Sequence, residues 1–158
     1  MFNDRKYLNL YNLLKYMLKK ILVAIDGSPQ SSKALDIAID MAKRFESKLY
    51  IVHVIEEQKY MLAINYPPAY PEMVDSLLKN AKELLDEAAK KAMEQGVNAE
   101  QLLERGDAAS KIIDAADNLC VDMIVMGSRG LRGVTKFLLG SVSERVVKYS
   151  KRPVMVIK

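Results

Sequence analysis

Cysteine is scarce in this chain of 158 residues, which contains one cysteine and one histidine. A lone cysteine cannot form an internal disulfide, and this is typical of proteins from a reducing cytoplasm. Cys120 stands between a predicted helix and a predicted strand, so we expect a small core residue there. No second cysteine and no histidine lies near it in the sequence, and the pattern therefore does not indicate a catalytic thiol.

Long apolar runs are also missing, and the longest are far too short to span a bilayer. No secretory signal is visible. The net charge of +4 is small and spread along the chain, which argues against a nucleic-acid or membrane partner. What is present is an ordinary globular composition, 50% hydrophobic and 28% charged, with enough length for one domain and a sizeable core.

The first residues differ from the rest of the chain. Apolar residues recur there at helical spacing, so residues 3–19 are predicted to form an amphipathic helix. The residues that carry this pattern are Leu10, Leu13, Leu14 and Met17. We assign 1–19 to an N-terminal helical extension and 20–158 to the main domain. The helix would dock on the domain or, as we favour, on a second subunit; alternatively, it is upstream sequence before a natural start at Met17.

Beyond this segment, short apolar runs alternate with helical patterns. The runs that read as strands are 21–25, 49–55, 97–104, 123–126 and 154–157. Helical patterns follow Ser28, Glu72, Asp107 and Gly140. Strands that alternate with helices predict a parallel sheet with helices on both faces. The polar third strand and the last strand, which starts after Pro153, belong at the sheet edges.

Open parallel sheets bind ligands where the strand order reverses, in a crevice at the carboxyl ends of the strands. Asp26 directly follows the first strand, and its carboxylate could accept hydrogen bonds from ribose hydroxyls. It could equally cap Ser28 or other loop amides. His53 lies inside the second strand without a partner acid placed by the sequence, so we assign it no chemistry.

Glycines follow the fourth strand in a pattern that suggests phosphate binding. The strand stops at Gly127, Gly130 follows, and nine residues later Gly140 and Ser141 open a helix. Glycine lets a phosphate approach main-chain amides, and a helix start adds positive dipole. The hydroxyls of Ser141 and Ser143 could also donate to phosphate. Alternatively, residues 141–144 form a plain capping box and the glycines serve turn geometry alone.

A long connection at 56–71 is rich in tyrosine and proline, as functional loops often are. Tyr60, Tyr66 or Tyr70 could cover a bound base, although a role in anchoring the loop is favoured.

Taken together, these motifs resemble the universal stress protein family. The likeness covers nearly all of 19–158 and is carried by ILVAIDGSPQSSKAL at 21–35, HV at 53–54, GD at 106–107, VDMIVMGSRG at 121–130, FLLGSVSERV at 137–146 and RPVMVIK at 152–158. The spacing Gly127-x2-Gly130-x9-Gly140-Ser141 matches the pattern of the family's ATP-binding branch at every glycine. The resemblance implies a Rossmann-like α/β fold, with a five-stranded parallel sheet ordered 3-2-1-4-5. It also implies a homodimer joined near the last strand, to which the N-terminal helix could add.

The resemblance further implies a set of binding residues. Asp26 would contact the ribose, while Ala24, Ile25, Val52 or Val54, Met126 and Gly127 would line the adenosine pocket. The phosphates would be held by Gly130, Gly140, Ser141, Val142 and Ser143. Arg129, Arg132 and Lys136 could add positive charge, or could belong to a solvated loop. Mg²⁺ or Mn²⁺ would be carried on the phosphates of ATP, and no metal ligand or catalytic residue is assigned.

The leading hypothesis is thus a cytoplasmic ATP-binding regulator, a nucleotide-dependent switch in the stress response that acts on an unidentified protein partner. A weak ATP hydrolase acting with a partner is the alternative from the enzyme class. Efficient turnover is not expected, because the sequence has no P-loop, no placed general base and no pair of metal-binding carboxylates. A third hypothesis is a dimeric interaction module that binds AMP or no nucleotide.

Overall fold

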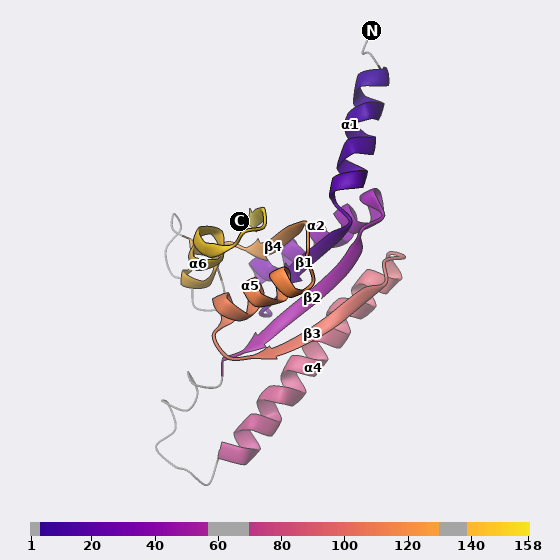
Figure 1. Cartoon of the computed structure of the whole chain (residues 1–158). Helices are drawn as coiled ribbons and strands as arrows, with labels where there is room; N and C mark the ends of the chain where they lie inside the picture. Colours follow the sequence, from indigo (N-terminus) through magenta and orange to yellow (C-terminus); the bar gives the residue numbers. More distant parts are fainter. Residues whose placement is uncertain (1–3, 57–69, 130–138) are drawn as a thin grey trace.

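The computed structural model describes residues 4–56, 70–129 and 139–158, with side chains from 9, 71 and 139 onward in the three segments. A parallel sheet of five strands, ordered β3-β2-β1-β4-β5, forms its centre (Figure 1). The strands are β1 Lys20–Ala24, β2 Lys48–Ile55, β3 Ala99–Arg105, β4 Met123–Gly127 and β5 Val154–Ile157. The predicted fold class, the strand order and both edge strands are confirmed.

Helices cover both faces of this sheet, as predicted. They are α2 Pro29–Phe45, α4 Tyr70–Glu94, α5 Ala108–Asn118 and α6 Ser141–Tyr149, preceded by α1 Asp4–Met17. Side chains of α2 and α4 join the buried cluster on one face, and those of α5 and α6 join the cluster on the other. The long helix was expected over 72–95, so α4 begins two residues earlier and ends one residue earlier than the pattern indicated.

Helix starts follow the capping residues that the sequence contains. The Ser28 side chain accepts a hydrogen bond from the Ser31 amide, and Pro29 occupies the first helical position of α2. Asp107 caps α5 in the same way by accepting from the Ser110 amide. Both predicted caps are therefore present, and both helices begin at the carboxyl end of the sheet.

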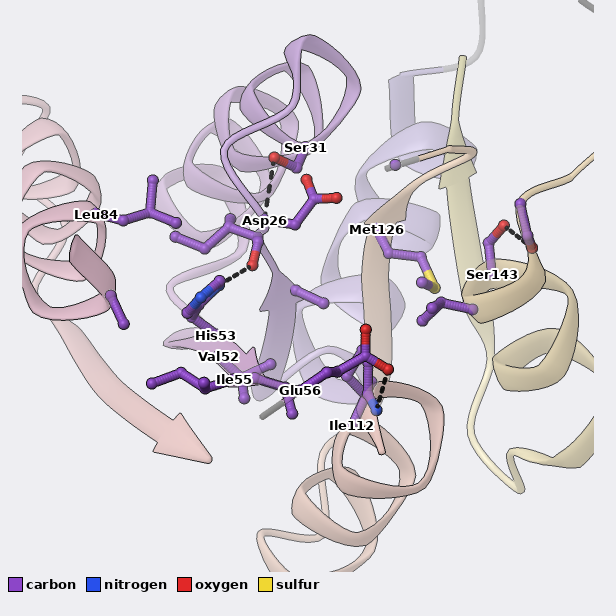
Figure 2. Close-up of a pocket in the computed structure, with 18 of the residues that line it drawn as sticks. Asp26, Ser31, Val52, His53, Ile55, Glu56, Leu84, Ile112, Met126 and Ser143 are labelled. Atoms are coloured by element: carbon purple, nitrogen blue, oxygen red, sulfur yellow. Dashed lines mark hydrogen bonds between the residues drawn. The ribbon is translucent and has the colours of Figure 1, made fainter. Parts of the chain in front are cut away.

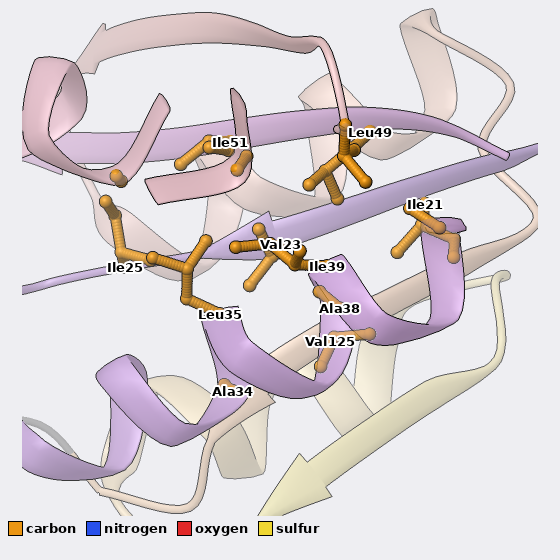
Figure 3. Close-up of a cluster of buried hydrophobic side chains, with 14 of the residues drawn as sticks. Ile21, Val23, Ile25, Ala34, Leu35, Ala38, Ile39, Leu49, Ile51 and Val125 are labelled. Carbon is orange, nitrogen blue, oxygen red and sulfur yellow. The ribbon is translucent and has the colours of Figure 1, made fainter. Parts of the chain in front are cut away.

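The core lies on both sides of β1, which is buried along nearly its whole length. Ile21 and Val23 point toward α2 and α4 together with Leu49 and Ile51 of β2, and Figure 3 shows this cluster around Ile39. Leu22 belongs to the cluster on the opposite face. A strand that is buried on both faces explains why this run is continuously apolar and does not alternate.

Cys120 is not the core residue that we expected, because it is exposed. Helix α5 ends at Asn118, and Cys120 then takes a left-handed conformation with φ of 50°. This turn directs the next residue, Val121, into the core, where it is fully buried. The core position at this helix–strand joint thus belongs to Val121.

The N-terminal helix α1 extends from the body at the end of the sheet opposite the carboxyl ends of the strands (Figure 1). Its contacts are with the end of α2: the Tyr11 hydroxyl donates to the Arg44 carbonyl at 2.6 Å, and Lys15 pairs with Glu46 at 2.5 Å. The predicted amphipathic helix is present, but its apolar residues Leu10 and Leu13 remain exposed. None of the described helices has the length and apolar character that a bilayer span requires.

Two isoleucines on α2 allow a direct test of the core. Ile39 is 0% exposed in the cluster against β1, whereas Ile37 on the same helix is 37% exposed. We expect Ile39→Ala to lower the free energy of unfolding by roughly 2–5 kcal/mol, because it leaves a cavity in a packed interior. Ile37→Ala should cost less than about 1 kcal/mol. Urea denaturation of both variants measures the difference, and equal losses would contradict this packing.

Candidate nucleotide site

A cavity of about 500 Å³ opens at the carboxyl ends of β1, β2 and β4. The register brings these ends together, because Ala24 pairs with Val52 on one side and with Met126 on the other. Every predicted binding residue that the structure describes lines this cavity: Ala24, Ile25, Asp26, Val52, Val54, Met126, Gly127, Arg129, Gly140, Ser141, Val142 and Ser143. Gly130, Arg132 and Lys136, together with Tyr60, Tyr66 and the Tyr70 side chain, lie outside the described residues.

Asp26 occupies the turn between β1 and α2, on the wall of this cavity (Figure 2). Its Oδ1 atom accepts a hydrogen bond from the Ser28 amide at 3.0 Å, and its own amide donates to Ser31 Oγ at 3.3 Å. The turn-capping role considered for Asp26 is therefore real. It uses one oxygen, and we find no partner for Oδ2 within the described residues. A carboxylate oxygen thus remains to accept hydrogen bonds from a ligand.

Main-chain groups at the end of β2 also face this cavity. The Val52 carbonyl accepts from the Ile25 amide at 2.9 Å, and the Ile55 carbonyl accepts from the Gly106 amide at 2.9 Å. Main-chain groups alternate sides along a strand, so those of Val54 point in the same direction as those of Val52, toward β1. The structure describes no main-chain bond to Val54 on this side, and Val54 lines the cavity, so its N–H and C=O form an adjacent donor and acceptor there.

The opposite end of the cavity is the start of α6. Gly140 is the N-cap residue and has no side-chain cap, so the amides of the first turn have no partner within the helix. These amides belong to Ser141, Val142 and Ser143, all of which line the cavity. They can donate together to an anion, and the helix dipole favours negative charge at this place.

Two expectations for this helix start are corrected. Residues 141–144 do not form a capping box, because the helix begins at Ser141 and Gly140 is the cap. The Ser143 hydroxyl does not face a ligand as a free donor. Ser143 is 2% exposed, and its Oγ atom lies 2.8 Å from the Ser128 carbonyl and 2.9 Å from the Gly140 carbonyl, so its hydrogen is donated to these two acceptors. Ser143 therefore offers its amide to the cavity, and Ser141 offers both an amide and an exposed hydroxyl.

Two of the glycines also lie at close contacts between elements. A Cβ atom on Gly127 would lie 2.9 Å from main-chain atoms of Gln30 and Ser31, so β4 could not approach the start of α2 this closely with any other residue. A Cβ atom on Gly140 would lie 3.3 Å from Arg129 Cα. The contact at Gly127 accounts for that glycine even without a ligand, whereas a Cβ atom at Gly140 would require only a small shift of Arg129.

Comparison with known proteins identifies the family of this chain. The model of the universal stress protein family matches residues 17–158. The universal stress protein YxiE of Bacillus subtilis is 38% identical over 148 residues, which cover 90% of this chain and 100% of YxiE.

The chain belongs to the universal stress protein family. Among solved structures, hypothetical protein MJ0577 aligns with a TM-score of 0.79 and 30% identity, over 90% of this chain and 96% of its own. Another universal stress protein, solved in complex with cAMP, aligns with a TM-score of 0.63 and 26% identity, over 89% of this chain and 96% of its own. The match to the family model begins near the end of α1, so most of that helix precedes the matched region.

Several residues at this universal stress protein site were not predicted. Glu56 and Ala108 lie on the cavity wall beside α5, where Glu56 Oε1 accepts from the Ala108 amide at 3.3 Å. Leu77, Ala81 and Leu84 form a wall from α4. The sequence shows α4 as an amphipathic helix but does not indicate that part of its apolar face lies beside a ligand cavity. The described residues contain no group of three or more His, Cys, Asp or Glu side chains arranged for a metal ion.

A salt bridge fixes the start of α5 to α6 at the rim of the site. Arg145 donates from both terminal nitrogens to the Asp107 carboxylate, at 2.7 and 2.8 Å. Asp107 also accepts from the amide and the hydroxyl of Ser110. The hydrogen bonds from Arg145, followed by those from Ser110, hold the pKa of Asp107 well below its usual range. The pKa of Arg145 is raised by the same contact.

The lowered pKa of Asp107 predicts how its contribution depends on pH. The carboxylate stabilises the fold above its unfolded pKa of about 4, and this stabilisation is lost as pH falls through the lower pKa of the folded state. Asp107 and Arg145 side chains are 45% and 47% exposed, so solvent screens the pair. We expect Asp107→Asn to cost roughly 1 kcal/mol of unfolding free energy at pH 7 and progressively less below about pH 4.

Urea denaturation between pH 3 and 7 would measure this difference between the parent chain and Asp107→Asn. Asp117→Asn is the matched control, since Asp117 makes a single 3.4 Å contact with Arg152 at similar exposure. Its effect should be smaller. A cost for Asp107→Asn that stays constant down to pH 3 would contradict the lowered pKa.

Proposed function

We propose that this protein is an ATP-binding regulator, a nucleotide-dependent switch in the stress response for which its family is named. The observation that carries the proposal is the content of one cavity. A carboxylate at Asp26, a main-chain donor and acceptor at Val54 that no described main-chain group pairs, and the amides that begin α6 all line it. These groups match, in order, the ribose, the base and the phosphates of a nucleotide.

At the base end, apolar side chains surround the Val54 main chain. Val52 and Met126 are buried core residues of the sheet, and Ile112 of α5 lies against them. A flat apolar ring would bury its faces against these side chains while its edge bonds to the strand. Asp26 follows β1 beside this position, so its free oxygen would accept from a ribose hydroxyl.

At the other end, the start of α6 favours a chain of phosphates. The amides of Ser141, Val142 and Ser143 are held in place by the helix, so they can donate to a phosphate without a change in the main chain, and they lie at the positive end of the helix dipole. Arg129 on the cavity wall would add positive charge. Mg²⁺ or Mn²⁺ would reach the site on the phosphates, because these ions bind ATP oxygens and water readily without a dedicated protein cage.

The relative in complex with cAMP supports an adenine nucleotide in this fold. It also makes a cyclic monophosphate the second candidate ligand. We favour ATP because the α6 amides, at the opposite end of the cavity from Val54, would offer a separate anion site that a longer phosphate chain could reach. We propose binding without efficient hydrolysis, since the sequence has no P-loop and no positioned base. The partner that responds to the bound state would be another cytoplasmic protein.

The substitution Ser141→Asp separates ligand binding from folding. An acidic residue in the first turn of a helix is stabilising, so the free energy of unfolding should stay equal or rise by up to about 1 kcal/mol. The same charge repels a phosphate at this place. We therefore expect ATP affinity, measured by calorimetry, to fall by a factor of ten or more, a loss of about 1.4 kcal/mol.

Ser32→Asp is the control for added charge, because Ser32 is an exposed residue in the first turns of α2 and does not line the cavity. It should leave ATP affinity nearly unchanged. Calorimetry with cAMP in parallel separates the two candidate ligands. Equal ATP affinity in both variants and the parent chain would reject the α6 phosphate site, and tighter binding of cAMP than of ATP would favour the second candidate.

We also propose a homodimer joined at β5, to which α1 adds a second contact between the subunits. In this proposal α1 belongs to an N-terminal extension, 1–19, that precedes the main domain, 20–158. β5 is an edge strand whose residues Val154–Ile157 are all partly exposed. The Pro153 and Ile157 carbonyls accept from Ile124 and Ser128, so the Val156 main chain faces the open edge. On α1, Leu10, Leu13, Leu14 and Met17 are exposed at i, i+3, i+4 and i+7.

The open edge of β5 can be tested with proline. Val156→Pro removes an outward N–H without removing a bond to β4, and edge strands tolerate proline. We expect it to convert a dimer into a monomer in light scattering, with an unchanged circular dichroism spectrum. A dimer that persists in Val156→Pro but dissociates in Leu13→Glu would place the interface on α1; a dimer that survives both substitutions would reject both contacts.

A further inference from the structure

The main-chain ladder between β1 and β2 ends one step earlier than its geometry allows. Its last bond is from the Ile25 amide to the Val52 carbonyl, at 2.9 Å. In a regular parallel ladder, the next bond would run from the Val54 amide to the Ile25 carbonyl. Ile25 stays next to β2, yet the described main chain contains no such bond.

The Ile25 carbonyl is instead taken by a side chain. His53 Nδ1 lies 2.8 Å from this oxygen. A carbonyl can only accept, so Nδ1 carries the hydrogen and donates. Figure 2 shows the bond, with the His53 ring on the side of β2 that faces Leu84 of α4. The side chain thus crosses from β2 to β1 on one face of the sheet, while the Val54 side chain packs on the other face.

We propose that His53 is a positioning residue that determines base specificity, because it occupies the Ile25 carbonyl and so leaves the Val54 N–H free to read a base. This inference rests on the proposed function. The Val54 N–H and C=O then act as a short strand edge toward the ligand. An adenine edge carries an amino donor beside a ring-nitrogen acceptor, which is the complement of this pair.

The same pair disfavours bases with a carbonyl in place of the amino group. Guanine and hypoxanthine carry the O6 acceptor where adenine carries its amino donor, and their N1 carries a hydrogen. In one common pose, O6 would face the Val54 carbonyl and N1–H would face the Val54 N–H. Two like groups would be opposed, so the site should prefer adenine to hypoxanthine, although the two rings have nearly the same shape.

His53→Leu removes the donor and keeps an apolar side chain of moderate size. The Ile25 carbonyl then has the Val54 amide as its nearest donor, and the ladder should extend by one bond. We expect ATP affinity to fall about tenfold, as one hydrogen bond to the base is lost. The preference for ATP over inosine triphosphate should shrink by the same factor. His53→Asn is the rescue variant, because its Nδ2 stands where His Nδ1 stands and can donate to Ile25.

Hydrogen exchange of single amides, followed by NMR without nucleotide, tests the positioning step itself. In the parent chain, the Val54 amide should exchange much faster than the Val52 amide, which lies in the ladder. In His53→Leu, Val54 should become protected, while His53→Asn should resemble the parent. A merely structural role for His53 would not produce selective protection of one neighbouring amide.

Calorimetry with ATP and inosine triphosphate on the same three proteins completes the experiment. Protection of Val54 equal to that of Val52 in the parent chain would overturn the proposal, as would unchanged base preference in His53→Leu. If the parent chain binds neither nucleotide, the proposed function fails. The positioning role of His53 would still be supported if the Val54 amide exchanges fast in the parent chain and becomes protected in His53→Leu. If the Val54 amide shows no such gain in protection, the positioning role is rejected.

Discussion

β1 pairs with β2 on one side and with β4 on the other, and this double pairing places the part of the cavity that the sheet contributes. The three strands are distant in sequence, yet the register aligns Ala24 with both Val52 and Met126. Asp26, Val54 and Gly127 follow these positions within two residues, so they emerge at one edge of the sheet. The apolar run of β1 is flanked by the charged residues Lys20 and Asp26, so a shift in register would bring one of these charges into the buried part of the sheet, and the geometry of the cavity is therefore fixed by the core.

The helices complete the cavity from both faces of the sheet. α5 and α6 begin at the carboxyl edge, and the Asp107–Arg145 pair holds the start of α5 against α6. α6 has only nine residues and a glycine cap without a side-chain bond, so its stability depends on such contacts. Its uncapped amides are then available for a ligand. A serine or aspartate cap at position 140 would satisfy one of them and weaken the anion site.

The sequence predicted most of this arrangement because the relevant signals are local. Unbroken apolar runs indicated the strands, and Ser28 and Asp107 marked helix starts through ordinary capping chemistry. The parts that were missed depend on contacts between segments. The Ser143 hydroxyl donates to the Ser128 carbonyl, and His53 Nδ1 donates to the Ile25 carbonyl after β1. Neither hydrogen bond can be predicted from residue spacing. The prediction for Cys120 was wrong because Cys120 itself takes a left-handed conformation, so that the next residue, Val121, is the one buried in the core.

Gly127 illustrates why a matching motif does not by itself assign a function. The absence of a Cβ atom there allows close packing against Gln30 and Ser31, a requirement that would hold in a relative that binds no nucleotide. Loss of binding after substitution of this glycine would therefore reflect disturbed packing as much as a missing ligand contact. Ser141 and Val54 are more informative, since the Ser141 hydroxyl is exposed and no described main-chain group pairs with the Val54 N–H, so a ligand could bond to either without displacing a packing contact. Polar groups at a cavity wall that have no partner in the protein are the ones through which a ligand can gain binding energy, because a hydrogen bond to them breaks no hydrogen bond within the protein.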